Sequence, residues 1–453
     1  MGCFFGEYGF VMVATPKQLG PLVSTLGSTW MLMALAGSVY LATSTDVTAQ
    51  DATWTGPGGE WTTGSNWNPA TVPSGIATFT NTIGAPAAVT ISNTTSNHTM
   101  EFTGAAPAYS FTVTNGASFT IDNGMNNASS FLPSFAVNTG ATLVVGDLAD
   151  VPIGVLTDGS SGGGTIVIGP TGPAAFLTLT PATDTTFSGS FSGLGSLELG
   201  NTSATLTITG ARNGGNIGTI GGDLTVCNCS GGGLTISGGA LTVNGLGQGV
   251  VIEGGTLSVV NGGRLQDNAN LLVAGAMVVS GAGSSATVAG VTGIGFFGAG
   301  QLTIINGGTL DSQGGAEIDA IFGTPSVTVT GAGSTWNVGV FGLAVGGGST
   351  GGPGNLTVAN GGRVITAGIV GVGDLGPGTS FMTVMGAGSA VTAGGGLLIG
   401  QTSVAIGTVN IGDGGVVNAA AGTSIGAGSA LNLGMGGLGG AIVTPTIDNE
   451  GAI

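Results

Sequence analysis

Basic side chains are almost missing from this sequence. Four Lys and Arg residues stand against 21 Asp and Glu in 453 residues, which gives a formal net charge of -17. Charged residues make up 6% of the chain, whereas about a quarter is usual in globular proteins. Such an acidic chain repels phosphate backbones, so the composition argues against nucleic acid as a partner. It is also unlike the composition of an ordinary cytoplasmic enzyme.

Histidine and cysteine are equally scarce. His98 is the only histidine, and the three cysteines are Cys3, Cys227 and Cys229. The sequence contains no CxxC, HExxH or Walker motif and no GxSxG elbow in a strand-to-helix context, and isolated glycine-rich stretches carry no meaning in a chain so rich in glycine, so we predict no catalytic residue, metal site or cofactor. In the segment VCNCS the two cysteines would lie about 6.5 Å apart along a strand, at the limit for a disulfide. Two buried or weakly bridged thiols are therefore favoured over a redox or metal motif.

Paired carboxylates are the remaining route to an enzyme. A β-helix enzyme that degrades polysaccharides would need two of them on one sheet face. Glu317 and Asp319 are the best such pair, whereas Asp147 and Asp150 do not share a face. Such sites also depend on positive charge, and Lys17 is one of the four basic residues, which leaves three after the first 49 positions. We predict a non-enzymatic protein and keep the polysaccharide-degrading enzyme as the alternative.

Glycine is abundant, with 95 residues, and 42% of the chain is hydrophobic. The apolar residues alternate with polar ones in short runs, which is the pattern of strands and can bury a core. This regularity and the low charge argue against a disordered chain. The sequence therefore predicts an all-β protein.

One pattern occurs three times between Met277 and Ala420. Each copy opens with a strand that leads into Gly-Ala-Gly-Ser, as in MVVSGAGS, VTVTGAGS and MTVMGAGS, and later has a second strand that ends in a glycine pair, as in GQLTIINGGTL. The first glycines of the three GAGS segments are Gly281, Gly331 and Gly386, in steps of 50 and 55 residues. A fixed period of this kind predicts repeats that bury their apolar faces by stacking on their neighbours.

These motifs carry a resemblance to a known bacterial repeat. GAGS after a V-x-V strand, the Trp in GSTWNV (Gly333 to Val338) and the strand L-T-V-x-N-G-G resemble the repeat shared by autotransporter (type V secretion) passengers and PEP-CTERM exported proteins. With a degenerate copy, the likeness covers about Gly255 to Ala420. It implies a right-handed parallel β-helix or solenoid, displayed outside the cell as a stalk or adhesin. An outer-membrane translocator barrel, absent from this chain, and host or matrix glycans or proteins are the partners it implies.

A shorter period precedes these repeats. Phe119, Leu143 and Ile166 occupy equivalent points, in steps of 24 and 23 residues. We interpret one step as one coil, so residues 81–254 form coils of about 24 residues and residues 255–453 form two-coil repeats of about 50. Asn-Gly pairs favour positive φ, and we expect corners of the coils at the pairs that begin with Asn115, Asn261, Asn306 and Asn360.

The N-terminus predicts export. Lys17 precedes an apolar run from Leu26 to Ala42, and Val47-Thr48-Ala49 suits signal peptidase. Residues 1–49 are therefore expected to be a signal peptide cleaved before Gln50, with Met12 as an alternative start. A transmembrane anchor is the alternative for the apolar run. The mature protein is expected to be secreted or held at the cell surface or outer membrane.

A tryptophan-rich segment follows, at residues 50–80. We expect Trp54, Trp61 and Trp67 to be buried as the cap of the first coil, because an open coil end needs cover. The alternative is an exposed aromatic platform for sugars. At the other end, Ala441 to Ile453 resembles a strand, a corner and the start of a strand, so we expect the solenoid to be incomplete there.

Three further patterns are weak. Arg264 and Arg363 both follow a glycine pair, but equivalent positions lack a basic residue, so a solvated ridge is favoured over a basic site. The segments GVGDLGPG (371–378) and IGDGGVV (411–417) only partly match calcium-binding repeats. Ice binding would need regular threonine rows, whereas the threonine pairs are scattered at Thr112/Thr114, Thr178/Thr180 and Thr207/Thr209.

Overall fold

The structure is a computed structural model, and it describes most of the chain after Thr48. The described residues are 49–80, 87–160, 162–210, 215–226, 231–245, 247–296, 298–347, 351–374, 378–402, 404–435 and 437–453. The predicted signal peptide up to Thr48, its alternative start at Met12, and the pair Cys227 and Cys229 lie outside these residues. Among the described residues, no helix is long and apolar enough to span a bilayer.

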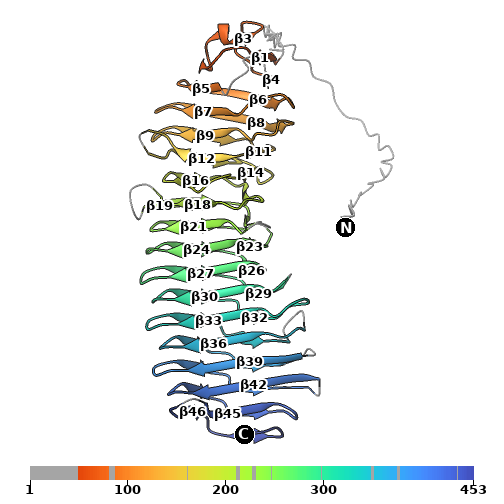
Figure 1. Ribbon diagram of the computed structural model, residues 1–453, viewed down its shortest axis with the longest axis vertical. Coiled ribbons are helices and arrows are strands. Elements are labelled where there is room, and N and C mark those ends of the chain that lie inside the picture. The colour runs from red at the N-terminus through yellow and green to blue at the C-terminus, as the bar shows by residue number, and fades with distance from the viewer. Residues whose placement is uncertain are drawn as a thin grey trace, which may run out of the picture. The chain divides into compact units, whose positions relative to one another are not determined.

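The unit Ala49–Ile453 is a stack of parallel β-coils with three faces. Along most of the chain three successive strands form one coil, with one strand on each of three faces that are numbered 1 to 3 below. The strands occur in the order face 3, face 1, face 2. Each strand pairs in parallel with the equivalent strand of the next coil (Figure 1). A single short 3-10 helix, Gly64–Asn66, is present among the described residues. The predicted parallel β-solenoid is therefore confirmed.

Face 1 is an 18-stranded sheet. Its strands are β1 (Ala52–Trp54), β3 (Trp67–Asn68), β4 (Ile76–Phe79), β6 (Thr95–Phe102), β8 (Ser118–Asn127), β10 (Thr142–Val145), β13 (Thr165–Ile168), β16 (Ser190–Ser192), β19 (Asn216–Ile220), β22 (Ala240–Val243), β25 (Arg264–Asp267), β28 (Ser285–Val288), β31 (Thr309–Ser312), β34 (Thr335–Val338), β37 (Arg363–Thr366), β40 (Ala390–Ala393), β43 (Val416–Ala419) and β46 (Ala441–Val443).

Face 2 is a 13-stranded sheet that begins further along the chain. Its strands are β11 (Asp150–Ile153), β14 (Phe176–Leu179), β17 (Ser196–Leu199), β20 (Leu224–Val226), β23 (Gly249–Ile252), β26 (Asn270–Val273), β29 (Thr292–Ile294), β32 (Ala316–Ile318), β35 (Leu343–Val345), β38 (Val370–Val372), β41 (Leu397–Ile399), β44 (Thr423–Ile425) and β47 (Ile447–Asn449).

Face 3 consists of two sheets that take the same place in the order of the coil. The first has β2 (Gly59–Glu60), β5 (Ala87–Ile91), β7 (Tyr109–Val113), β9 (Ser134–Val137) and β12 (Val155–Asp158). The second has β15 (Thr185–Phe187), β18 (Thr205–Ile208), β21 (Gly233–Ser237), β24 (Thr256–Val260), β27 (Ala276–Ser280), β30 (Gln301–Ile305), β33 (Ser326–Thr330), β36 (Asn355–Ala359), β39 (Gly378–Met385), β42 (Ala405–Gly412) and β45 (Ala430–Met435).

The register of the strands explains both sequence periods. Leu143 pairs with Phe119 on one side and with Ile166 on the other, which confirms these predicted equivalent points. Further along, Leu302 pairs with Met277 and with Val327, so one fifty-residue repeat is two coils. Sixteen strands of face 1 follow one another from β4 to β46, and at about 4.8 Å per strand they span about 72 Å.

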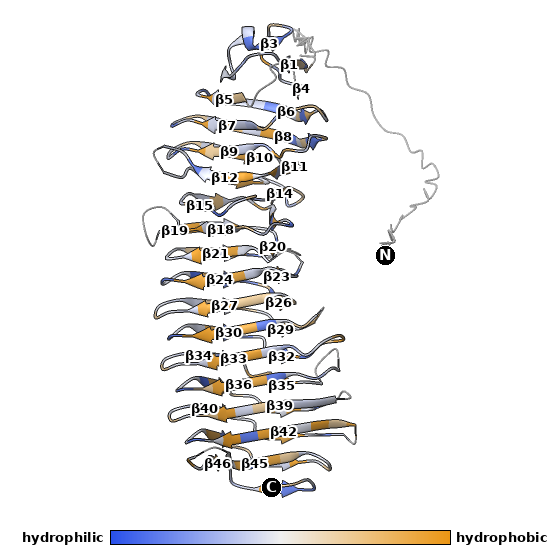
Figure 2. Ribbon diagram, viewed as in Figure 1, coloured by the Kyte–Doolittle hydropathy of each residue, from blue (hydrophilic) through white to orange (hydrophobic). Residues whose placement is uncertain are grey.

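The core is a column of apolar side chains inside the stack. Within each strand, alternate residues point inward, and in β30 the inward residues are Leu302 and Ile304. Figure 2 shows this as apolar and polar residues alternating along the strands of successive coils. Full burial of a Leu or Ile side chain stabilises a fold by roughly 1.5–3 kcal/mol. Because every coil adds such residues on all faces, stacking supplies the stability that a single coil lacks.

The tryptophan-rich segment closes the N-terminal end of the stack. Trp54, Trp61 and Trp67 are 0%, 0% and 2% exposed. Trp61 contacts the rings of Trp67 and Phe119 at centroid distances of 4.8 and 4.9 Å, and Trp67 Nε1 donates a 2.7 Å hydrogen bond to the Trp61 carbonyl. The expected burial of the three rings is confirmed, and the alternative of an exposed sugar platform is wrong for them.

The Asn-Gly pairs of the later repeats lie at corners of the coils. Asn261, Asn306 and Asn360 have φ of 53°, 56° and 51°, and Asp413 takes the same conformation with φ of 49°. This left-handed region is costly for most L-residues, and Asn and Asp tolerate it best after glycine. The pairs are therefore solenoid corners and not hairpins, as the sequence predicts.

The corners are bonded to both neighbouring coils. Asn306 Nδ2 donates to Ser280 Oγ of the preceding coil at 3.4 Å. The Gly307 amide donates to Ser334 Oγ of the next coil at 3.0 Å, and that hydroxyl donates to the Thr330 carbonyl at 2.7 Å. The same arrangement recurs one repeat later, from Gly361 to Ser389. Asn-Gly corners and GAGS corners are thus complementary and alternate, which gives the repeat its two-coil period.

Candidate functional site

The predicted carboxylate pair does not share a surface. Glu317 lies in the middle of β32 and its side chain is half-buried on the outside of face 2. Asp319 is 1% exposed, because β32 ends at Ile318 and the chain turns inward at the corner, where the Asp319 amide donates to the Ile294 carbonyl. The expectation of a same-face pair is therefore wrong.

Asp147 and Asp150 have separate environments, as expected. Asp147 accepts hydrogen bonds from the side chain and amide of Thr171 and from the Gly172 amide in the next coil, which hold its pKa below the usual value. Asp150 is exposed at the start of β11. Among the residues that the structure describes, no three His, Cys, Asp or Glu are grouped so as to hold a metal ion.

The two predicted arginines lie in one column of face 1 but far apart. Between Arg264 and Arg363 the column holds Ser285, Thr309 and Thr335. Four strand spacings amount to about 19 Å, so the two guanidinium groups belong to separate places. The register places no basic residue between them, as expected for a solvated ridge.

A threonine row that sequence analysis missed runs along face 3. Thr303, Thr328, Thr357 and Thr383 are in register on four successive strands, with their side chains outward. The threonines noticed in the sequence are divided among the sheets: Thr112 lies in β7, Thr178 in β14 and Thr207 in β18. Since the coils differ in length, only the register of the strands shows the row.

One hollow in the described surface is a groove along face 2. Its floor is a row of outward-facing residues, one from each face 2 strand between β26 and β41. These residues are Leu272, Gly293, Glu317, Ala344, Gly371 and Leu398. Because Gly and Ala fill the middle of this row, the surface is low on both sides of Glu317. Two adjoining hollows of about 260 and 450 Å³ meet at Val291 and Glu317.

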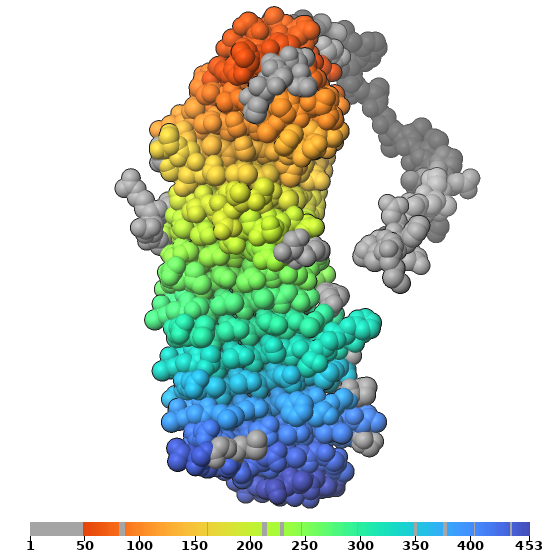
Figure 3. Space-filling model, viewed as in Figure 1, coloured from red at the N-terminus to blue at the C-terminus, as the bar shows by residue number. Residues whose placement is uncertain are grey.

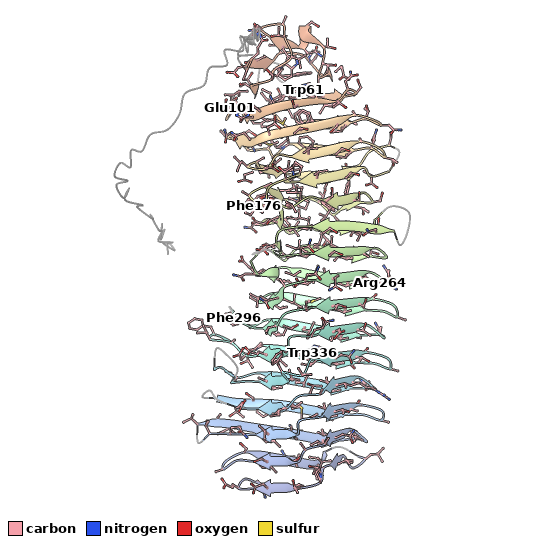
Figure 4. The ribbon with its side chains drawn as sticks, turned by 180° about the vertical axis from the view of Figure 1, so that it is seen from behind. Trp61, Glu101, Phe176, Arg264, Phe296 and Trp336 are labelled. Carbon is pink, nitrogen blue, oxygen red and sulfur yellow. The ribbon has the colours of Figure 1, made fainter. Side chains whose placement is uncertain are left out.

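Apolar side chains form the walls of the groove. On the side of the corner between faces 1 and 2 lie Val291, Phe341 and Ile369, which are 39%, 83% and 44% exposed. Phe296 lines the groove on the N-terminal side of Glu317, in the same hollow as Gly293. Figure 4 shows Phe296 at the edge of the stack opposite to Arg264, and Figure 3 shows the column of stacked coils to which these residues belong. This side of the groove therefore exposes several apolar side chains.

The groove and its face are acidic. The Asp374 carboxylate lies over the floor at Gly371, where a β-carbon on that glycine would be 3.3 Å from Asp374 Oδ2. Partial burial raises the pKa of Asp374. Higher on the same face, burial and then repulsion from Glu253 and Asp150 raise the pKa of Glu198. No Lys or Arg is among the residues that line the groove.

Comparison with known proteins adds little to this. No protein-family model and no curated protein matches the sequence. A solved structure, that of the TibC-catalysed hyper-glycosylated TibA fragment 55–350, aligns with 82% of this chain and 100% of its own at 16% sequence identity, with a TM-score of 0.24. At that score we base no argument on the likeness, and the fold assignment rests on the register of the strands.

Proposed function

We propose that this chain is a non-enzymatic, exported surface protein, a passenger-like stalk with an adhesive surface. The observation that carries the proposal is the unbroken parallel pairing of the face 1 strands from β4 to β46. A continuous stack of this kind is a stiff spacer, because each coil is held by its neighbours along its whole length. Export after cleavage near Ala49 is part of the proposal and rests on the sequence pattern.

Deletion of two coils tests the stalk. Removal of residues 206–256 joins Thr205 to Leu257, and both Leu206 and Leu257 are equivalent to the deleted Leu234 in the register. The change leaves the tryptophan cap and the groove floor from Leu272 to Leu398 in place, although it removes Gln248 from one end of the groove lining. We expect the variant to fold cooperatively and to be shorter by about 10 Å, two strand spacings, as measured by small-angle X-ray scattering.

A matched measurement on cells tests the location. Protease added to intact cells is expected to cleave the protein. The full-length chain and the variant without residues 206–256 should be displayed on the cell surface in equal amounts. Loss of folding on removal of two coils, or protection of the chain from external protease, would contradict a modular surface stalk. Loss of a glycan-degrading activity in the shortened variant would favour the enzyme alternative.

A further inference from the structure

We propose that the groove on face 2 binds an extended peptide segment that carries lysine or arginine side chains. This gives the adhesive surface a class of ligand and to that extent rests on the proposed function. The argument has three parts, which are the dimensions of the groove, its charge and the nature of its walls.

The groove has the dimensions of a short extended strand. Its floor follows the stack across the strands β26 to β41, from Leu272 to Leu398. Five strand spacings amount to about 24 Å, and an extended peptide advances about 3.3 Å per residue, so about seven residues fill it. A linear ligand is favoured because the hollows adjoin along the stack and not across it.

The charge of the groove selects a cationic ligand. Glu317 on β32 and Asp374 above Gly371 on β38 are two coils apart along the floor, which is about 10 Å. The only Lys or Arg residues in the described part of the chain are Arg264 and Arg363, and both lie on face 1. A ligand with several amines therefore meets carboxylates along face 2 and no repelling cation.

The walls suit side chains with an apolar stem and a charged end. Phe341 and Ile369 stand on neighbouring corners beside the floor at Ala344 and Gly371. The methylene stem of a lysine packs on such a wall while its ammonium reaches a carboxylate, and an aromatic ring also attracts the cation. A sugar polymer would use several flat aromatic faces, whereas the lining supplies Phe296 and Phe341 among aliphatic residues.

The experiment uses the purified chain and a seven-residue peptide of alternating lysine and serine, which places its amines on one side when extended. Binding is measured by calorimetry and compared with a peptide that has glutamine in place of lysine. The variants are Glu317→Gln, Asp374→Asn and Phe341→Ala. The control is Asp311→Asn, which removes the same charge from the outside of face 1.

We expect the lysine peptide to bind and the glutamine peptide not to bind. Each carboxylate variant should weaken binding about fivefold, the upper range for an exposed ion pair, and Phe341→Ala should weaken it by a similar factor. The Asp311→Asn protein should bind like the original. Thermal melting of each variant shows whether its fold is intact.

Two results would overturn the proposal. If Asp311→Asn weakens binding as much as Glu317→Gln, the attraction is only that of the net charge. If a glucosamine oligomer of the same length binds as tightly as the lysine peptide, and the groove variants weaken both equally, the groove recognises amines on a linear chain and not a peptide. Neither result would contradict the proposal of a surface stalk, because that proposal is tested by the length of the protein and its exposure on the cell surface.

Discussion

The first coils and the later coils bury their cores with different side chains. From β1 to β9 the core is aromatic: Trp61, Phe79 and Phe111 contact one another, and Phe111 also contacts Phe135. From β24 onward it is mainly aliphatic, and Trp336 is the exception. The later coils add GAGS corners that alternate with left-handed Asn-Gly corners. The first coils have the predicted corner at Asn115-Gly116, where positive φ falls on Gly116 and not on the asparagine.

The difference follows from the position in the stack. At the N-terminal end β1 pairs with β3 in antiparallel fashion and with β4 in parallel, so an irregular strand pair precedes the regular parallel stack from β4 onward. Large rings cover much apolar area for few residues and can close an irregular end. A coil in the middle has a neighbour on both sides, so small side chains and repeated hydrogen bonds are enough. Buried aromatic area thus stabilises the N-terminal end of the stack, whereas repeated hydrogen bonds between neighbouring coils stabilise its middle.

The largest effect should come from the aromatic end. We expect Trp61→Ala to lower the free energy of unfolding by about 3–5 kcal/mol, the usual range for an aromatic residue removed from a core. Urea denaturation measures it, and Trp61→Phe is the control that keeps a ring. A loss below about 1 kcal/mol would mean that packing area does not hold this end.

The next effect concerns a buried carboxylate in the middle of the stack. Asp267 is fully buried and accepts hydrogen bonds from the amides of Ala269 and Val250, and burial raises its pKa to about 6. A raised pKa means that the folded state binds the proton more tightly. Its contribution to stability is therefore present below about pH 4 and is lost as the pH rises through about 6.

Over that window we expect a loss of about 3 kcal/mol attributable to Asp267. Unfolding curves at several pH values check it, with Asp267→Asn as the variant that does not titrate. The difference between the two proteins should grow from pH 4 to pH 7. A difference independent of pH would show that the carboxylate is not buried within the stack.

A smaller effect should come from the corners. Ser334→Ala removes the acceptor of the Gly307 amide and should cost about 1–3 kcal/mol, because a polar group in the stack loses its partner. The neighbouring Thr335→Ala, on an outward position of face 1, is the control and should cost less. Equal losses in chemical denaturation would argue against the alternating corners as the basis of the repeat.

The smallest effect concerns the left-handed conformation itself. Asn306→Ala should cost about 1–2 kcal/mol, since alanine tolerates this region poorly. Asn306→Gly should restore most of that loss, because glycine adopts positive φ without strain. If the two variants unfold alike, the side-chain bond to Ser280 and not the backbone conformation sets the cost.

The sequence predicted the parts of the fold that repeat or alternate locally. The pairing of Phe119, Leu143 and Ile166, the two-coil repeat and the left-handed corners follow from spacing and from Asn-Gly chemistry. Burial of the three tryptophans follows from their concentration at one end. Each of these depends on a short stretch of chain or on a fixed period.

The candidate site depends on features that a single strand does not contain. Glu317 and Asp319 are two residues apart, which would place them on one face of a strand, but β32 ends at Ile318 between them. The groove exists because Gly293, Ala344 and Gly371 fall in one column with Glu317. The turns between strands vary in length, so the column is visible only once the coils are stacked.

The central claim is the parallel, in-register stack, and a pair of engineered cysteines tests it most directly. Thr328 and Thr357 are partners on neighbouring strands, whereas Thr383 is one strand further along the row. In a chain with its native cysteines replaced by serine, the pair Thr328→Cys and Thr357→Cys should form a disulfide, because stacked strands are about 4.8 Å apart. The pair Thr328→Cys and Thr383→Cys, at about 10 Å, should not. Cross-linking of the distant pair without the near one, detected by mass spectrometry, would contradict the account.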